Sequence, residues 1–114
     1  MITFFSNHTD TSFIEEYTGE QVRVIKHPYI EPEWTFAQVL TNCKDEINEA
    51  VKATKLIING DYTLVSSIVM ERFLQNKRTG FITMKKLNEP TSEKDSEGNI
   101  IHRNILKPIN IRWI

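Results

Sequence analysis

Residues 55–67 constrain the fold more than any other stretch, because an apolar run passes through a tight turn directly into a helical pattern. The run ends at Asn59, Gly60 and Asp61, and apolar residues then recur at helical spacing. This order is typical of a buried parallel strand, a turn and the N-terminus of a helix. In open α/β sheets, ligands bind outside the carboxyl ends of strands, where such turns lie. The stretch therefore predicts an α/β fold and marks a candidate site.

The turn offers several groups that suit an anion or a sugar hydroxyl. N–H groups at a helix N-terminus carry partial positive charge and attract phosphate. The side chains of Asn59 and Asp61 can hold a ribose hydroxyl, and Ser66 and Ser67 add two hydroxyl groups. A purely structural interpretation stays open at this point, in which Asp61 or Thr63 caps the helix and Gly60 eases the turn.

Two further strand–helix units precede this stretch. Residues 2–6 predict a short apolar strand, and the polar residues 6–12 lead into a short helix that ends at Gly19. Residues 22–26 predict a second strand. Residues 33–53 predict a long helix, because apolar residues recur there at steps of three and four.

The C-terminal part predicts the end of the sheet. We expect the helix after residue 60 to close at Gly80, residues 81–85 to form a fourth strand and residues 88–99 to form an exposed loop or hairpin tip. Residues 100–114 predict a closing strand. The whole order predicts a Rossmann-like three-layer sandwich, with a mainly parallel sheet closed by a C-terminal antiparallel hairpin.

The first and third strands are neighbours in a 2-1-3-4 strand order, so the loops 6–12 and 59–67 should share one cleft. His8 is the candidate catalytic residue, because histidine titrates near neutrality and serves as a general acid or base; an ordinary exposed loop histidine is the alternative. Lys85 and Lys86 can add positive potential at the rim. The predicted ligand-binding residues are Ser6, Asn7, Thr9, Ser12, Asn59, Gly60, Asp61, Tyr62, Thr63, Ser66, Lys85 and Lys86.

Composition excludes several classes of protein. The 114 residues predict one domain, 1–114, and a net charge of −1 argues against a protein that binds long nucleic acid. The single cysteine, Cys43, permits no internal disulfide and lies on the apolar face of the long predicted helix. We find no run of transmembrane length, no signal peptide and no spacing typical of metal ligands. We therefore expect a cytoplasmic protein that uses no metal, no other cofactor and no membrane partner.

Four short motifs carry a resemblance to a known family. They lie at residues 5–9 (Phe-Ser-Asn-His-Thr), 59–65 (Asn-Gly-Asp-Tyr-Thr-Leu-Val), 83–86 (Thr-Met-Lys-Lys) and 104–113 (Asn-Ile-Leu-Lys-Pro-Ile-Asn-Ile-Arg-Trp). In these motifs the chain resembles the small stand-alone CRISPR-associated Csx proteins with a CARF-like (Rossmann-like) fold, several of which are ring nucleases.

The resemblance implies a homodimer whose two clefts form one pocket for a cyclic oligoadenylate, first of all cyclic tetra-adenylate. It implies cleavage without metal, in which a ribose 2′-hydroxyl attacks its adjacent phosphate and leaves a 2′,3′-cyclic phosphate, ending type III CRISPR signalling. His8 would assist proton transfer. Two alternatives stay open. One is a non-catalytic binder that sequesters or senses the same messenger, and the other is an unrelated flavodoxin-like nucleotide-binding or protein-interaction module.

Overall fold

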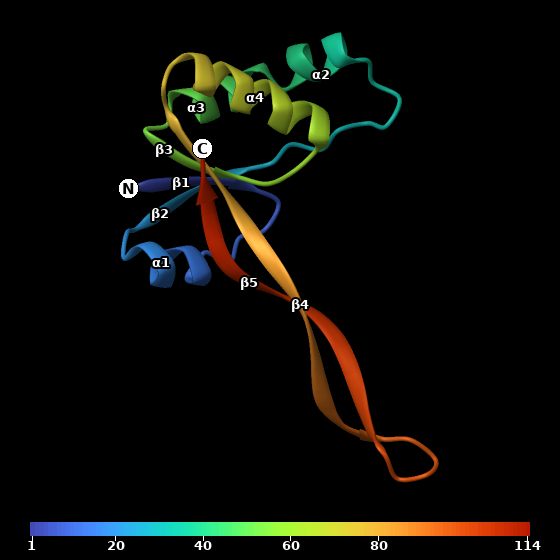
Figure 1. Cartoon of the computed structure of the whole chain (residues 1–114). Coiled ribbons are helices and arrows are strands. Elements are labelled where there is room, and N and C mark those ends of the chain that lie inside the picture. The colour runs from blue at the N-terminus through green and yellow to red at the C-terminus, as the bar shows by residue number, and fades with distance from the viewer.

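The computed structural model describes all residues, 1–114, and contains one five-stranded sheet with helices on both faces (Figure 1). The strands are β1 (Ile2–Ser6), β2 (Val22–Lys26), β3 (Lys55–Ile58), β4 (Arg78–Lys94) and β5 (Ile100–Trp113). The helices are α1 (Ser12–Thr18), α2 (Phe36–Asn42), α3 (Lys44–Lys52) and α4 (Tyr62–Leu74). Helix α1 covers one face of the sheet, and α2, α3 and α4 cover the other (Figure 1).

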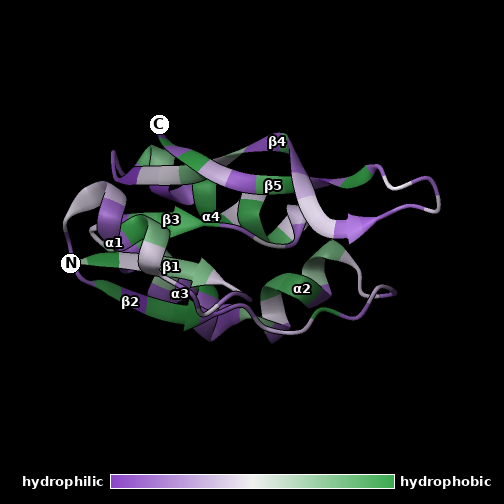
Figure 2. Ribbon diagram, turned by 90° about the horizontal axis from the view of Figure 1, so that it is seen from below, coloured by the Kyte–Doolittle hydropathy of each residue, from purple (hydrophilic) through white to green (hydrophobic).

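The strand order is β2-β1-β3-β4-β5. The pairs β1–β2, β1–β3 and β3–β4 are parallel, and β4–β5 is antiparallel. The predicted α/β class, the order of the first four strands and the antiparallel C-terminal hairpin are therefore confirmed. β1 and β3 are hydrophobic along most of their length (Figure 2), as expected of parallel strands that are covered on both faces.

Two hydrophobic clusters hold the layers together, one on each face of the sheet. The larger cluster lies under α2, α3 and α4 and includes Phe5, Leu56 and Leu64. The smaller cluster lies under α1 and includes Phe4 and Ile14. Alternate residues of β1 thus point to opposite faces, so that both helix layers pack on the same central strand.

The predicted long helix 33–53 is wrong in its extent. Thr35 is the N-cap of the first segment, α2, and forms a capping box with Gln38, so that the helix begins at Phe36, three residues later than expected. The backbone then leaves helical geometry at Cys43 (φ −107°, ψ 18°), which separates α2 from α3. Cys43 is nevertheless buried at 1% exposure, as its place on the apolar stripe predicted.

The C-terminal boundaries also differ from the prediction. Helix α4 ends at Leu74 rather than at Gly80, because Asn76 adopts a positive φ of 56° just beyond it. Strand β4 begins at Arg78 and continues to Lys94, so residues 88–94 of the predicted loop belong to a strand, and only residues 95–99 form the hairpin tip. The outer part of the hairpin, residues 84–109, extends away from the body (Figure 1), and we call it the arm.

Arg72 is a fully buried cation that joins α3, α4 and β4. Its guanidinium donates to the carbonyl oxygens of Ala50, Val51, Ala53, Thr54 and Arg78 and to Oγ1 of Thr79. Four of these carbonyls lie at or just beyond the C-terminus of α3, where unpaired carbonyls carry partial negative charge. Burial lowers the pKa of the guanidinium. Arg72 therefore caps α3 from the neighbouring helix.

No helix is both long enough and apolar enough to cross a membrane.

Candidate functional site

The carboxyl ends of β1, β2 and β3 lie side by side at one edge of the sheet. The Asn59 N–H donates to the carbonyl of Phe5 (3.0 Å), and the His27 N–H donates to the carbonyl of Ser6 (3.1 Å). The chain leaves β1 toward the face of α1 and leaves β3 toward the face of α4 (Figure 1). This edge is therefore the switch point of the sheet, where α/β folds bind ligands.

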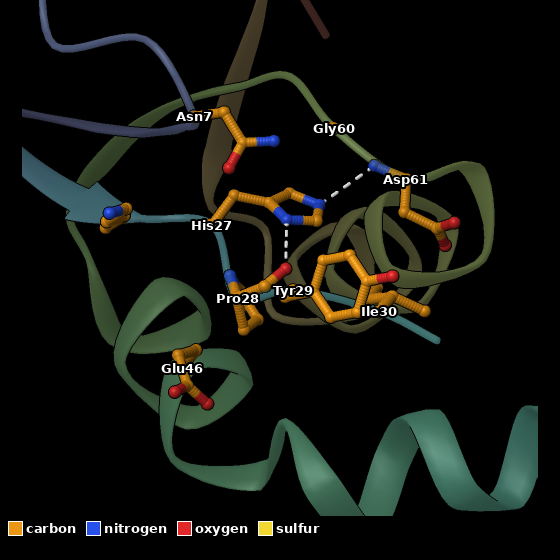
Figure 3. Close-up of a pocket in the computed structure, with 9 residues that line it drawn as sticks. Asn7, His27, Pro28, Tyr29, Ile30, Glu46, Gly60 and Asp61 are labelled. Carbon is orange, nitrogen blue, oxygen red and sulfur yellow. Dashed lines mark hydrogen bonds between the residues drawn. The ribbon is translucent and has the colours of Figure 1, made fainter. Parts of the chain in front are cut away.

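An open pocket of about 700 Å³ lies at this edge, and we call it the His27 pocket. It is lined by Asn7, Lys26, His27, Pro28, Tyr29, Ile30, Glu46, Gly60 and Asp61 (Figure 3). These residues come from the ends of all three strands and from α3. Most of the lining is polar or charged, which suits a phosphate or a sugar better than an apolar ligand.

His27 lies at the centre of this pocket and is 6% exposed. Its Nε2 accepts a hydrogen bond from the Asp61 N–H (2.9 Å), and its Nδ1 lies 2.6 Å from the carbonyl oxygen of Pro28 (Figure 3). Because Nε2 is an acceptor, the ring proton belongs on Nδ1, which donates to Pro28. His27 thus connects the residues after β2 with the turn after β3.

The sequence prediction missed His27 because it assigned no partner to that histidine. A usable signal existed, since His27 directly follows the last residue of β2 and so belongs to the same strand-end position as Asn7 and Asn59. The rule that selected the first and third strand ends selects the second strand end as well.

The turn after β3 caps helix α4 and also contains backbone N–H groups that have no hydrogen-bond acceptor. The Asp61 carboxylate accepts from the N–H groups of Thr63 (2.9 Å) and Leu64 (3.1 Å), so the structural interpretation of Asp61 as helix cap is confirmed. The N–H groups of Gly60 and Tyr62 have no acceptor within the chain. The Gly60 N–H remains available to an anion in the His27 pocket, and the Tyr62 N–H is available in a separate hollow beside α4.

A second pocket, of about 420 Å³, lies on the α1 face of the same edge, and we call it the His8 pocket. Its polar lining residues are His8, Asp10, Ser12 and Asn59. Its apolar lining residues are Phe4, Phe13, Ile14, Ile58, Phe81, Ile82, Met84 and Pro108. An apolar wall with a few polar groups at one side suits a planar ring such as a nucleobase.

Hydrogen bonds inside the loop after β1 shape the His8 pocket. The His8 N–H donates to Oγ of Ser6 (3.0 Å), and the Asp10 carboxylate accepts from the backbone N–H and the hydroxyl of Ser12. These bonds, the one from the hydroxyl most of all, lower the pKa of Asp10. The imidazole of His8 makes no hydrogen bond within the chain, so its nitrogens are available to a ligand.

The predicted binding residues divide between the two faces of the sheet edge. Asn7, Gly60 and Asp61 line the His27 pocket, whereas Ser12 and Asn59 line the His8 pocket beside His8. Tyr62 and Ser66 line a smaller hollow of about 290 Å³ between α4 and β4. The side chain of Tyr62 is 87% exposed, and it is therefore free to stack on a ligand.

The other predicted binding residues lie outside these pockets. Ser6 is 1% exposed and its hydroxyl is engaged by His8 N–H, so it has a structural role. Thr9 and Thr63 line neither pocket. Lys85 and Lys86 lie on the exposed beginning of the arm, past Met84. The structure groups the strand-end residues and leaves these five apart.

No group of three or more His, Cys, Asp and Glu side chains is placed to hold a metal ion. Comparisons with protein-family models, with curated proteins and with solved structures find no match to this chain.

Proposed function

We propose that the chain binds a cyclic oligoadenylate, first of all cyclic tetra-adenylate, in a CARF-like (Rossmann-like) domain. One observation carries this proposal: two chemically different pockets flank the adjoining ends of β1 and β3. A cyclic oligoadenylate alternates charged phosphate and ribose with flat, largely apolar bases. A ligand of this kind needs a polar pocket for phosphate and ribose and an apolar pocket for a base, close to each other.

The His27 pocket supplies the groups for phosphate and ribose. Lys26 brings a positive charge, Asn7 brings an amide, and the free N–H group of Gly60 adds a donor. Glu46 and Asp61 also line this pocket, and their carboxylates suit ribose hydroxyls rather than phosphate oxygens. The polar lining thus separates into donor and acceptor positions.

The His8 pocket supplies the surface for an adenine. Phe13, Phe81 and Met84 provide apolar contact for the base, and Asn59 can hydrogen-bond its edge. An exposed aromatic, Tyr62, stands on the opposite side of the same edge. Aromatic stacking is worth about 1–3 kcal/mol per base, enough to contribute strongly to affinity.

We propose that His8 assists cleavage by removing the proton from a ribose 2′-hydroxyl. The 2′-oxygen then forms a bond to the adjacent phosphorus while the bond from phosphorus to the 5′-oxygen breaks. The products carry a 2′,3′-cyclic phosphate and a 5′-hydroxyl, which takes up a proton. Positioning of the 2′-hydroxyl and donors to the phosphate supply the rest of the rate enhancement.

We also propose that the working form is a homodimer. Helix α4 is apolar on more than its buried side, and Met70, Phe73 and Leu74 are 66%, 69% and 71% exposed. These three residues are spaced i, i+3 and i+4 and so share one exposed face, and an exposed apolar face of this kind marks an interaction surface. A two-fold dimer presents each contact twice, which suits a ring with two-fold symmetry.

A second candidate function is binding without cleavage, for sequestering or sensing the messenger. One observation favours it: His8 is the only histidine in its pocket, and no carboxylate of the chain holds its ring. Catalytic histidines are commonly oriented by such a partner.

The test is incubation of pure protein with cyclic tetra-adenylate in EDTA, with products resolved by mass spectrometry. We expect multiple-turnover formation of products with 2′,3′-cyclic phosphate ends.

The variant His8→Ala should cleave about 100-fold more slowly and bind nearly as tightly, whereas the control His102→Ala on the arm should cleave like the native chain. Equal rates for His8→Ala and native protein would remove His8 from the mechanism. Binding without product would favour the second candidate, and no binding would contradict both.

A further inference from the structure

The arm, residues 84–109, exposes apolar side chains without a covering surface. Ile100, Leu106 and Ile109 are 53%, 65% and 51% exposed. The radius of gyration is 17.7 Å, against about 13 Å for a compact domain of this length. An isolated two-stranded ribbon is marginally stable in water. A ribbon that is this apolar therefore calls for a partner surface.

Charge is divided along the arm. The base of the arm, residues 84–88 and 104–109, holds three cations and no carboxylate, and these cations are Lys85, Lys86 and Lys107. The outer part, residues 89–103, carries a net charge of −2, with the carboxylates Glu89, Glu93, Asp95 and Glu97. The arm is therefore positively charged near the body and negatively charged at its tip. Two such arms that lie antiparallel to each other bring opposite charges together.

The base of the arm also brings two like charges together. Lys85 and Lys107 are directly opposite each other in the β4–β5 ladder. Like charges in that position destabilise a strand pair. Within the chain, Glu89 neutralises Lys107, but no carboxylate pairs with Lys85 or Lys86. An acidic partner would relieve this repulsion.

We propose that the arm of one copy packs antiparallel along the arm of a second copy of this chain. The acidic tip of each arm then lies against the basic base of the other, and the exposed apolar side chains of both become covered. A parallel arrangement would place like charges together. The two-fold symmetry repeats the same contact twice, as a closed dimer requires. This inference rests on the proposed homodimer and is independent of any nucleotide. It places the two bodies at opposite ends of the paired arms, and α4 lies on the side of each body away from the arm (Figure 1), so the arm contact is an alternative to a contact through α4.

The test is sedimentation equilibrium of the full chain with two complementary charge reversals. The base variant is Lys85→Glu with Lys86→Glu, and the tip variant is Glu93→Lys with Glu97→Lys. These four side chains are exposed and make no ion pair, so the variants should fold. Lys107 and Asp95 are left intact, because Lys107 pairs with Glu89 and Asp95 holds the tip by accepting from Glu97 and Asn99 N–H groups. Circular dichroism confirms that each variant is folded.

The native chain should dimerise, and more weakly at high salt. Each variant alone should raise the dimer dissociation constant about tenfold or more. An equimolar mixture of the two variants should dimerise nearly as tightly as the native chain, because each mixed contact again joins opposite charges. Single variants that dimerise like the native chain would overturn the arm contact while leaving a homodimer through α4. A mixture of the two variants that does not regain the native dimer affinity would overturn the antiparallel arrangement. A monomeric native chain would overturn both the arm contact and the homodimer, and it would leave the proposed ligand binding unaffected.

Discussion

The imidazole of His27 lies so close to Gly60 that a Cβ at position 60 would stand 2.1 Å from the ring carbon Cδ2. The next N–H in the chain, that of Asp61, donates to Nε2 of the same ring. A buried side chain at the end of β2 thus sets the position of the turn after β3. The two strand ends form one wall of the His27 pocket because of this contact.

We expect Gly60→Ala to lower the free energy of unfolding by about 1–3 kcal/mol, since the added methyl group must displace a ring held at both nitrogens. Denaturant unfolding measures this loss. The same substitution made in a His27→Ala background should cost much less, because the ring that it meets has gone. Equal costs in the two backgrounds would show that the ring does not limit position 60.

The Asp61 amide should owe its protection from hydrogen exchange to His27. We expect this N–H to exchange about tenfold faster or more in His27→Ala, because its acceptor is lost. The Val65 N–H, which donates to the Asp61 carbonyl (2.8 Å), is the matched control and should change much less. An unchanged Asp61 exchange rate in His27→Ala would contradict the hydrogen bond to Nε2.

Replacement of Arg72 should be among the most damaging changes in the chain. Arg72→Met removes the donors to five carbonyl oxygens, most of them around the C-terminus of α3. Carbonyls left without partners inside a protein are costly, so we expect a loss of about 3–5 kcal/mol in the free energy of unfolding. Arg23→Met is the control, because Arg23 forms only an exposed pair with Glu49, and it should cost about 1 kcal/mol or less.

Cys43 should make stability depend on alkaline pH. Burial, first of all, and the nearby charges of Glu46 and Asp61 raise the pKa of its thiol. The folded chain then holds the thiol proton more tightly than the unfolded chain does. Its contribution to stability is complete below the unfolded pKa of about 8.5 and is lost as pH rises through the higher folded pKa, by up to about 1.4 kcal/mol per pH unit. Unfolding curves of native protein and Cys43→Ala should diverge in this range, and parallel curves would contradict the raised pKa.

Local sequence patterns predicted the first strands and the strand order of the sheet well. Residues 2–6 and 22–26 are strands with the predicted bounds, and the alternation of strands and helices led to the observed order of the first four strands. The predicted ends of helices and strands were wrong where tertiary packing, rather than local sequence, determines them. The apolar stripe through Cys43 continues across a break in the backbone, and it carries no signal of that break. β4 continues past Lys85, the predicted end of the strand, into polar residues because β5 supplies a partner, which no local pattern reveals.

The location of the candidate site was predicted, but its division into two pockets was not. Strand ends selected Asn7, His8, Asn59 and Gly60, and all four lie at the switch point. Sequence alone placed them in one cleft, yet adjacent residues after a strand leave toward opposite faces, so they line two pockets. His27 escaped notice because its partners are a backbone N–H and a backbone carbonyl, which the sequence does not show; only its place directly after β2 could have indicated it.

The most direct test of the account is an NMR titration of isotope-labelled native chain with cyclic tetra-adenylate. We expect saturable shifts of the backbone N–H signals of Asn7, His8, Gly60 and Tyr62, because the ligand meets both faces of the switch point. Signals of Asn48 and Gln75, which line a groove between α3 and α4, should stay in place. No shifts at millimolar ligand, or shifts confined to that groove, would contradict the assignment of this edge of the sheet as the nucleotide site.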